Sequence, residues 1–503
     1  MSDAKYKSLL ETLRKNIASG KYEGEGKMNI AKKVLSKGVL CALAGAASLA
    51  ASATGAALAM EPFADGDRVV LWGDSITHAG SYVQMLSDFY LTRYPDRDVR
   101  IFNAGVGGDN AGAAMTRWED DVRRREPTAV AVMFGMNDTW RDGLYAPSKM
   151  TNEAHLAALS AKERKCFEQY ATNMTRLVER VQRELPKARM TIMTPTPYDE
   201  TAAVTAARKV PVLKGTAAVL RRFSDFDRRL AREKGCGLVD WNASVQALVD
   251  ARQAKNPDFS FASNDRVHPW AQGHLFMTYE FLKAQGVNGV VSDVAVSAAD
   301  GRVLRSENAT VSDFAKTDDG CSFVVLEKSL PWPILKAAKA ALSWAPVDRE
   351  LNRETLAVEG LAAGKRHALF IDGENVGEWT AEELAKGVEL ARNPRTPQFR
   401  QAAEVGRLNG ERCALEMKPL RFLAAVRWFL HGRADADDLA AVRKYYDSLS
   451  EQQKKGYFEK LVPAYLRDYG RKAEVERDQE IRWAQLLKLR HPRPHRYELK
   501  TVK

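Results

Sequence analysis

The chain has 503 residues, of which 45% are hydrophobic and 28% are charged. This balance is that of an ordinary globular protein and excludes a wholly disordered or fibrous chain. The formal net charge is +11, but the first 37 residues alone hold nine basic and four acidic residues. The remaining excess is small and shows no basic stripe, so the composition argues against a nucleic-acid-binding protein.

The first 27 residues differ in character from the rest of the chain. Residues 6–22 resemble only the first helix of GntR-type winged-helix regulators, and no helix comes after them that could enter the major groove of DNA. We therefore interpret residues 1–27 as an extension that is either a mis-assigned start or a remnant, and we expect no nucleic-acid partner.

Residues 28–59 have the pattern of a signal peptide. Three lysines precede an uncharged stretch, 38–60, in which Ala-Leu-Ala forms a small-x-small cleavage pattern. The alternative is an uncleaved membrane anchor, because the stretch is long enough to span a bilayer. We predict a secreted or periplasmic protein, with no membrane contact beyond an anchor of this kind.

Strand-like and helix-like segments alternate between residues 65 and 290. Short apolar runs that end at turn residues predict strands buried on both faces, and apolar residues at three-and-four spacing predict helices. This alternation predicts an α/β doubly wound domain with a parallel sheet, in which reactive groups gather at the carboxyl ends of the strands. The predicted strands are 69–72, 99–102, 129–134, 190–193 and 237–240, and the predicted helices are 81–94, 161–185, 211–234 and 271–285.

The pattern changes after residue 290. Residues 291–380 alternate and are rich in turns, which predicts a small β-containing accessory segment inserted after the α/β domain. Residues 381–503 are highly charged and predict a helical carboxyl-terminal extension. Because residues 487–503 are basic and contain two prolines, we expect them to form a mobile tail.

Polar motifs follow the first three predicted strands. In Gly-Asp-Ser-Ile, Ser75 lies at a strand-to-helix turn, where its hydroxyl would project from the edge of the sheet. A free serine is a poor nucleophile, so it needs a base and an anion-stabilising pocket. Asn-Ala-Gly-Val-Gly-Gly-Asp at 103–109 supplies backbone N–H groups that a ligand can approach closely. It begins like a dinucleotide-binding fingerprint but has Asn110 where that fingerprint needs glycine.

Two further motifs complete the set. Gly-Met-Asn-Asp, after the third strand, offers the amide of Asn137 where an oxyanion could form; a simple Asn-Asp turn is the alternative. Asp265 lies three residues before His268, just ahead of the last predicted helix. From that position a carboxylate can orient the imidazole within the same loop.

In order and spacing, these motifs resemble the blocks of the SGNH (GDSL-type) hydrolases, from about residue 68 to residue 285. The resemblance implies a flavodoxin-like sheet and ester hydrolysis without a metal or other cofactor. It makes Ser75 the nucleophile, His268 the general base and Asp265 the residue that orients His268. It also assigns the oxyanion hole to the N–H groups of Ser75 and Gly108 and the side-chain amide of Asn137.

Other residues leave alternatives open. Ile76 stands where the family's nickname has leucine, a buried aliphatic exchange that puts little in doubt. His78 and Trp140 could line the acyl or leaving-group pocket, or they could simply pack in the core or at the rim. Four widely spaced cysteines remain after the predicted signal peptide, and they could form a disulfide or stay as buried free thiols.

The function that this resemblance favours is a secreted carbohydrate esterase. Its substrate would be a small-molecule or polysaccharide ester, with O-acetyl groups on carbohydrate as the first expectation. A lysophospholipase or thioesterase of the same family is the rival within the class, and it would need a longer apolar groove. A non-catalytic glycan-binding or cell-surface protein is the alternative of another class, but a binding module has no need of Ser75, Asn137, Asp265 and His268 together.

Overall fold

The structure is a computed structural model that describes residues 59–141, 161–203, 212–213 and 215–502. The predicted extension, 1–27, and residues 28–58 of the predicted signal peptide lie outside the described residues. Within the described ranges, no helix has the length and apolar character needed to span a bilayer.

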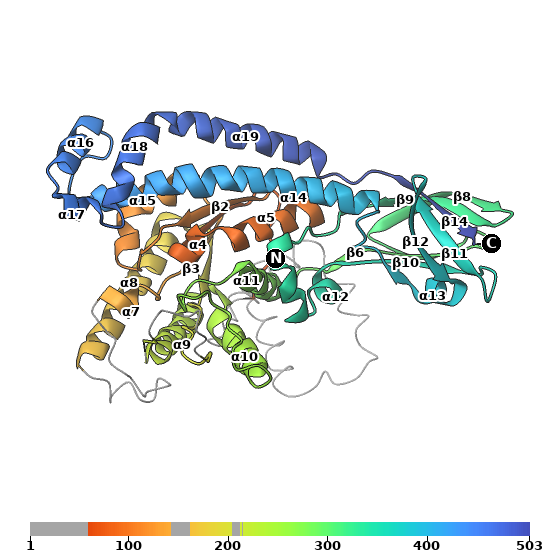
Figure 1. Cartoon of the computed structure of the whole chain (residues 1–503), viewed down its shortest axis with the longest axis horizontal. Coiled ribbons are helices and arrows are strands. Elements are labelled where there is room, and N and C mark those ends of the chain that lie inside the picture. Colours follow the sequence, from red (N-terminus) through yellow and green to blue (C-terminus); the bar gives the residue numbers. More distant parts are fainter. Residues whose placement is uncertain (1–58, 142–160, 204–211, 214, 503) are drawn as a thin grey trace, which may run out of the picture. The chain divides into compact units, whose positions relative to one another are not determined.

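A five-stranded parallel sheet lies at the centre of the domain that the first half of the described chain forms (Figure 1). Its strand order is β2-β1-β3-β4-β5, the flavodoxin-like order, and every pairing in it is parallel. Each strand starts within one residue of the position that the sequence predicts for it. The predicted α/β fold with a parallel sheet is therefore confirmed. The strands are β1 (Arg68–Gly73), β2 (Arg100–Gly105), β3 (Ala129–Met133), β4 (Arg189–Met193) and β5 (Gly237–Val239).

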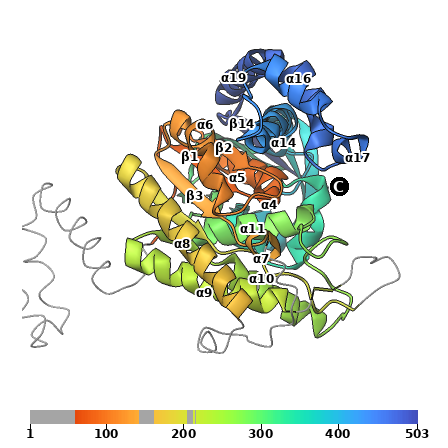
Figure 2. The ribbon, with the colours of Figure 1, turned by 90° about the vertical axis from the view of Figure 1, so that its left-hand side faces the viewer.

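Helices cover both faces of this sheet, which explains why its strands are continuous apolar runs. In β1, Val69, Val70, Leu71 and Trp72 are all fully buried. Figure 2 shows α5 and α11 together near the sheet and α8 beside α9. The four predicted helices are α5 (Ser81–Arg93), α8 (Ala161–Glu184), α9 (Thr216–Lys234) and α11 (Ala271–Ala284).

One helix of this domain was not predicted, namely α10 (Trp241–Gln253). The carboxylate of Asp240 accepts a hydrogen bond from the N–H of Ala243 and caps its first turn. Trp241, the first residue of α10, is fully buried in the same core as β1 and α11. Asp240 was included in the fifth predicted strand, but it follows the last residue of β5 and caps α10. An aspartate at this position is the sequence feature that indicates the start of this helix.

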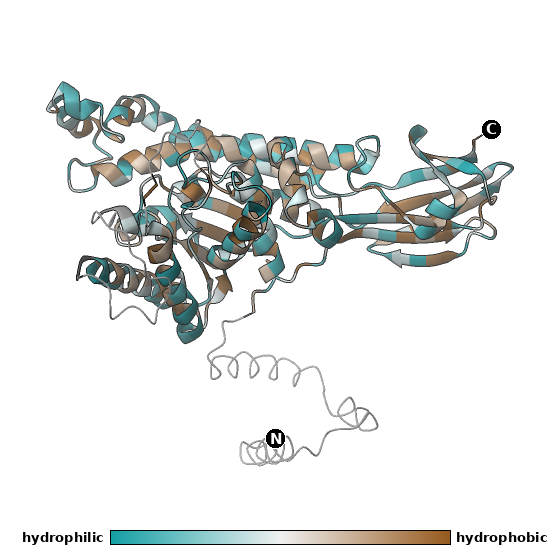
Figure 3. Ribbon diagram, turned by 60° about the horizontal axis from the view of Figure 1, so that its bottom comes forward, coloured by the Kyte–Doolittle hydropathy of each residue, from teal (hydrophilic) through white to brown (hydrophobic). Residues whose placement is uncertain are grey.

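The β-containing part has two sheets that share one hydrophobic core, as predicted for this segment. Figure 3 shows hydrophobic residues concentrated on strands and polar residues on the outer helices. One sheet has the order β13-β10-β6-β7, from β6 (Val290–Ser297), β7 (Val303–Glu307), β10 (Arg353–Glu359) and β13 (Val388–Glu389). The other has the order β12-β11-β14-β9-β8, from β8 (Ala309–Thr317), β9 (Gly320–Glu327), β11 (Arg366–Ile371), β12 (Glu374–Thr380) and β14 (His495–Thr501).

The prediction of a mobile tail at residues 487–503 is wrong. The end of the chain forms β14, which pairs in antiparallel fashion with β9 on one side and β11 on the other. Tyr497 and Leu499 are buried in the core between the sheets, while Arg496, Glu498 and Lys500, which alternate with them, belong to the opposite face of the strand. Apolar and charged residues alternate with a period of two in this segment, which is typical of a strand with one buried face. The prediction gave more weight to its basic charge and therefore missed the strand.

The carboxyl-terminal extension is helical, as predicted, and it packs on the parallel sheet domain. Helix α14 (Pro397–Leu415) contacts α5 and α19, and α15 (Arg421–Leu430) contacts the edge strand β2 (Figure 1). An edge strand exposes unpaired backbone groups, so this cover protects β2. The other helices of the extension are α13 (Ala381–Lys386), α16 (Leu439–Asp447), α17 (Glu451–Lys454), α18 (Val462–Asp468) and α19 (Lys472–Leu489), and a π-helical turn (Glu416–Leu420) joins α14 to α15.

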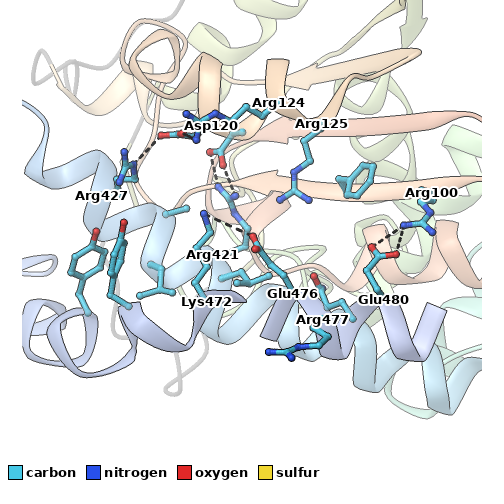
Figure 4. Close-up of a pocket in the computed structure, with 18 of the residues that line it drawn as sticks. Arg100, Asp120, Arg124, Arg125, Arg421, Arg427, Lys472, Glu476, Arg477 and Glu480 are labelled. Carbon is cyan, nitrogen blue, oxygen red and sulfur yellow. Dashed lines mark hydrogen bonds and ion pairs between the residues drawn. The ribbon is translucent and has the colours of Figure 1, made fainter. Parts of the chain in front are cut away.

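Ion pairs join this extension to the sheet domain around a cavity of about 650 Å³. Figure 4 shows the ion pairs between Arg427 of α15 and Asp120 and between Arg100 of β2 and Glu480 of α19, whose nitrogen–oxygen distances are 2.9 and 2.7 Å.

The remaining helices of the described residues are short. They are α4 (Ser75–His78), α6 (Trp118–Asp121), α7 (Asp138–Arg141), α12 (Val347–Leu351) and the 3-10 helices Ala113–Arg117, Arg123–Arg125, Lys336–Ser343, Glu459–Leu461 and Tyr469–Arg471. The four described cysteines, Cys166, Cys236, Cys321 and Cys413, are free and buried.

Candidate active site

The end of β1 places Ser75 at the carboxyl edge of the sheet. Gly73 allows the sharp turn there, because a Cβ on it would lie 3.0 Å from the carbonyl oxygen of Met133 and closer still to Thr77. The carboxylate of Asp74 accepts a hydrogen bond of 2.9 Å from the N–H of Ile76 and caps α4. Ser75 is therefore the first residue of a short helix, with its hydroxyl beyond the last residue of the strand.

The structure brings together the three residues that the sequence nominated as catalytic. His268 Nε2 lies 2.7 Å from Ser75 Oγ, and His268 Nδ1 lies 2.6 Å from Asp265 Oδ2. If Nδ1–H donates to the carboxylate, Nε2 is left to accept the serine hydroxyl proton. The side chains of His268 and Asp265 are 41% and 44% exposed, so a substrate can reach them from solvent.

Three hydrogen bonds within one loop hold the Asp265 carboxylate. Oδ1 accepts from Ser263 Oγ at 2.6 Å and from the N–H groups of Val267 and His268 at 3.0 Å each. Although partial burial acts in the opposite direction, these donors and the bond from the His268 ring hold the pKa of Asp265 well below its usual range. Asp265 is therefore an anion that accepts the Nδ1–H of His268 throughout the neutral pH range.

Arg266 fixes the shape of this loop between the two functional residues. Its φ is +68°, a left-handed conformation that side chains other than glycine rarely adopt. The N–H of Asp199 donates to the carbonyl of Arg266 at 3.1 Å, and the buried guanidinium of Arg266 donates to the carbonyl of Asp199 at 3.1 Å. This reciprocal pair holds the turn that places Asp265 and His268 on the same side, and sequence reasoning did not find it.

The three predicted oxyanion donors follow β1, β2 and β3, which are neighbours in the sheet. Among the described residues, the N–H groups of Ser75 and Gly108 donate to no protein acceptor. Asn137 donates one amide N–H to the carbonyl of Asp109 at 2.8 Å, and its second N–H remains for a ligand. The Asp138 carboxylate accepts from the N–H groups of Gly135 and Ala111, at 3.0 and 3.3 Å, and so ties the second and third of these loops together.

A buried ion-pair network braces the strand ends beneath this site, and sequence reasoning missed it. Arg117 donates to Asp109 and to Asp121 at 2.7 and 2.6 Å, and to the carbonyl of Gly73 at 2.9 Å. Arg421 of α15 donates to both carboxylate oxygens of Asp121 at 2.7 and 2.8 Å. Arg117 and Asp121 are four residues apart, a spacing that the sequence shows, whereas no local pattern could indicate Arg421.

We expect Asp121→Asn to lower the free energy of unfolding by about 3–5 kcal/mol, because it leaves the buried guanidinium of Arg421 without its ion-pair partner and removes one of the two carboxylates that pair with Arg117. Despite burial, which acts in the opposite direction, Arg421 and Arg117 hold the pKa of Asp121 below its usual range, so its charge is present at all ordinary pH values. Urea unfolding followed by circular dichroism measures the effect. The matched control is Glu480→Gln, which removes a charge that is 61% exposed and should change the stability by about 1 kcal/mol or less. Equal losses in the two variants would contradict the role given to this network.

Of the two residues predicted to line a substrate pocket, the structure describes the side chain of His78 but not that of Trp140. His78 Nδ1 accepts from the N–H of Gly107 at 3.2 Å, and its Nε2 lies 3.3 Å from the carbonyl of Met417. Both ring nitrogens are thus used within the protein, and burial lowers the pKa of His78 to about 4, so it stays neutral. His78 links the loop after β2 to the carboxyl-terminal extension rather than presenting a nitrogen to a substrate. Trp140 falls in α7, but its side chain lies outside the described residues.

Comparisons with known proteins agree with this geometry. Residues 71–275 match the GDSL-like lipase/acylhydrolase family. An acetylxylan esterase from Geobacillus stearothermophilus is 24% identical over 242 residues, which are 45% of this chain and 97% of that esterase. The structure of BT4096, a gut microbial diltiazem-metabolizing enzyme, has 29% sequence identity and a TM-score of 0.79, and the match covers 88% of this chain and 99% of that one.

A third match is LAE5, an α/β hydrolase enzyme from the metagenome of Lake Arreo, Spain, with 29% identity and a TM-score of 0.35 over 44% of this chain and 97% of its own. The likeness to the diltiazem-metabolizing enzyme is the broader one, since it covers more than the sheet domain. Residues 71–275 thus match the SGNH (GDSL-type) hydrolases in their motifs and in their parallel sheet, and the chain is a serine ester hydrolase.

Proposed function

We propose that the chain removes O-acetyl groups from carbohydrate through an acyl-enzyme formed on Ser75. The observation that carries the catalytic part is the continuous hydrogen-bonded line from Ser75 Oγ through the His268 ring to Asp265, with contacts of 2.7 and 2.6 Å. A nucleophile, a base and a residue that orients the base are the parts that acyl transfer needs.

The first half of the reaction forms the acyl-enzyme. His268 Nε2 takes the proton from Ser75 Oγ as that oxygen attacks the ester carbonyl carbon, and the carbonyl electron pair moves onto its oxygen. The N–H groups of Ser75 and Gly108 and the free amide N–H of Asn137 donate to this oxyanion. The intermediate then collapses, the bond to the alcohol oxygen breaks, and the alcohol leaves with the proton that His268 returns.

The second half regenerates the enzyme. His268 takes a proton from water, the resulting hydroxide attacks the acyl carbon, and the same three donors hold the second oxyanion. The bond between Ser75 Oγ and the acyl carbon breaks, Ser75 recovers its proton from His268, and the carboxylic acid departs. Asp265 keeps the imidazole in the useful tautomer and stabilises its charged form in both halves.

The likeness to an acetylxylan esterase supports carbohydrate as the alcohol part of the substrate. Trp270, which follows His268 by two residues, is 50% exposed, and a ring that is apolar on its face and polar at its edge suits a sugar. The proposal includes export through the signal-like segment 28–59, which would bring the enzyme to extracellular or periplasmic polysaccharide. The alternative within the family is a lysophospholipase or thioesterase, which would need a longer apolar groove. We favour the carbohydrate substrate over it because of the acetylxylan esterase likeness and the exposed Trp270.

A substrate panel tests the proposed function. It contains acetylated xylo-oligosaccharides, 4-nitrophenyl acetate, 4-nitrophenyl esters of longer acids, a lysophospholipid and diltiazem. We expect the highest kcat/KM on the acetylated oligosaccharides and a decline as the acyl chain of the aryl esters lengthens. Hydrolysis of the lysophospholipid or of the long-chain esters alone would contradict the carbohydrate assignment. Failure to hydrolyse any ester would contradict the catalytic account itself.

A further inference from the structure

We propose that the carboxyl-terminal extension completes the active site, and that Tyr457 forms a wall on which the sugar of the acetylated substrate packs. This inference rests on the proposed function and deepens it. The oxyanion loop is residues 105–109, which begin at the last residue of β2, and the helical cap is residues 416–469, which contain α15 to α18.

The helical cap reaches the oxyanion loop through the segment between α17 and α18. A Cβ added to Gly107 would lie 3.1 Å from the hydroxyl oxygen of Tyr457, and a Cβ added to Gly108 would lie 3.7 Å from the ring of Phe458. The two rings therefore lie within a few ångströms of the backbone that carries one of the oxyanion donors. Two residues that lie 350 positions later in the sequence thus border the oxyanion loop.

The two rings have different surroundings. Phe458 is half-buried and stacks on Phe429, with centroids 5.5 Å apart and planes 15° apart, so it anchors the segment in the core of the cap. Tyr457 stands perpendicular to Phe458, with centroids 4.8 Å apart, and is 60% exposed. Tyr457 thus presents exposed aromatic surface beside the oxyanion loop, in an orientation that its contact with Phe458 supports, although the Lys460 ammonium lies over the ring, 5.1 Å from its centroid.

Two links hold the helical cap against the oxyanion loop. The His78 ring joins the N–H of Gly107 to the carbonyl of Met417 in the π-helical turn, at 3.2 and 3.3 Å. The buried guanidinium of Arg421 donates to the carbonyl of Gly105 at 3.0 Å. A cap that is attached to the loop at both Gly105 and Gly107 can keep Tyr457 in a fixed position relative to the donors of the oxyanion hole.

The chemistry of Tyr457 fits an acetylated sugar. The ring face can pack against the C–H groups of a pyranose, and the hydroxyl can donate to or accept from a sugar hydroxyl. Because the acetyl group is small, most of the binding surface of such a substrate lies in the sugar, outside the reacting carbonyl. A small aryl acetate has no sugar to place on this wall, so the two substrates should depend on Tyr457 to different extents.

The test compares Tyr457→Ala with wild type on an acetylated xylo-oligosaccharide and on 4-nitrophenyl acetate. We expect KM for the oligosaccharide to rise roughly 3-fold to 12-fold, as for the loss of one aromatic contact, and kcat/KM for the aryl acetate to fall by a clearly smaller factor. Tyr457→Leu, which keeps apolar volume without a ring, should resemble Tyr457→Ala, and Tyr457→Phe should lose only the part due to the hydroxyl. Ile481→Ala, which removes a side chain that is 50% exposed on α19, is the control and should change neither substrate.

The relative losses on the two substrates distinguish a sugar wall from a structural role of Tyr457. A rise in KM for the oligosaccharide that exceeds the effect on aryl acetate supports the wall. Equal losses on both substrates would show that Tyr457 acts through the oxyanion loop or through stability, and no change on either substrate would show that it touches neither; both results overturn the inference. If the wild type cleaves aryl acetate but no acetylated oligosaccharide, the proposed carbohydrate function fails first, and the sugar wall fails with it.

Discussion

Ser75→Ala is expected to lower kcat for 4-nitrophenyl acetate by roughly 10⁴-fold to 10⁶-fold, because no other group in the site can carry the acyl intermediate. The His268 ring would lose its 2.7 Å partner, but the oxyanion donors and Asp265 would stay in place. Residual activity should therefore be that of water attacking a bound and polarised ester. Initial rates over a range of substrate concentrations, with purified protein, measure the loss.

The variant should keep its fold, since the Ser75 side chain makes its described hydrogen bond only to His268 and not to the core. The midpoint of thermal unfolding should match that of the wild type. Ser448→Ala, which removes an exposed hydroxyl bonded to the carbonyl of Tyr445, is the control and should retain full activity. If Ser75→Ala kept wild-type turnover, a different nucleophile would have to be sought.

Asp265→Asn is expected to lower kcat by roughly 10⁴-fold and to shift the pH profile. An asparagine amide can donate to Nδ1 of His268, which favours the tautomer with a proton on Nε2, and that nitrogen then cannot accept the proton of Ser75. Burial lowers the pKa of His268, but the hydrogen bond and charge of Asp265, together with the charge of Asp74, raise it above its ordinary value of 6.5. Because the base must be neutral, wild-type kcat/KM should be lost as the pH falls through a value above 6.5.

Asp265→Asn takes away the hydrogen bond to a carboxylate and the negative charge, which are the two largest contributions that raise the pKa of His268, and leaves burial, which lowers it, opposed only by the charge of Asp74. The acidic limb of the kcat/KM profile should therefore move to lower pH in the variant. The measurement is kcat/KM for 4-nitrophenyl acetate between pH 5 and pH 9. Asp258→Asn, which changes an exposed aspartate on the preceding segment, should keep both the rate and the limb of the wild type. A limb that stays in place, or moves to higher pH, would contradict the assigned role of Asp265.

The parallel sheet could be read from the sequence because burial on both faces leaves an unambiguous signal. Runs such as Val69–Trp72 are apolar at every position, since helices cover both sides of the strand, and they end at the turn residues that carry the chemistry. A half-buried strand at the end of the chain gave a weaker signal. In β14 charged residues alternate with Tyr497 and Leu499, and the charge suggested a tail although the period of two indicated a strand.

The residues of the active site also fall into those that could be predicted from the sequence and those that could not. Ser75, His268 and Asp265 could be proposed from the sequence because each lies in a short local motif whose residues need one another. Arg421 could not, because it acts over about 300 positions through Asp121 and the carbonyl of Gly105. Tyr457 is similar, since only the packing of the helical cap brings it to Gly107. Local spacing predicts the reacting groups, whereas the groups that hold and border them come from tertiary contacts.

The most direct measurement is to identify the residue that carries the acyl group. The enzyme is mixed with excess 4-nitrophenyl acetate and quenched in acid within the first turnover, and its peptides are mapped by mass spectrometry. We predict an added acetyl group on the peptide that contains Ser75, and its absence in Ser75→Ala treated in parallel. An acetyl group on a different residue at the same stoichiometry, or full turnover by a chain that never carries acetyl on Ser75, would contradict the account.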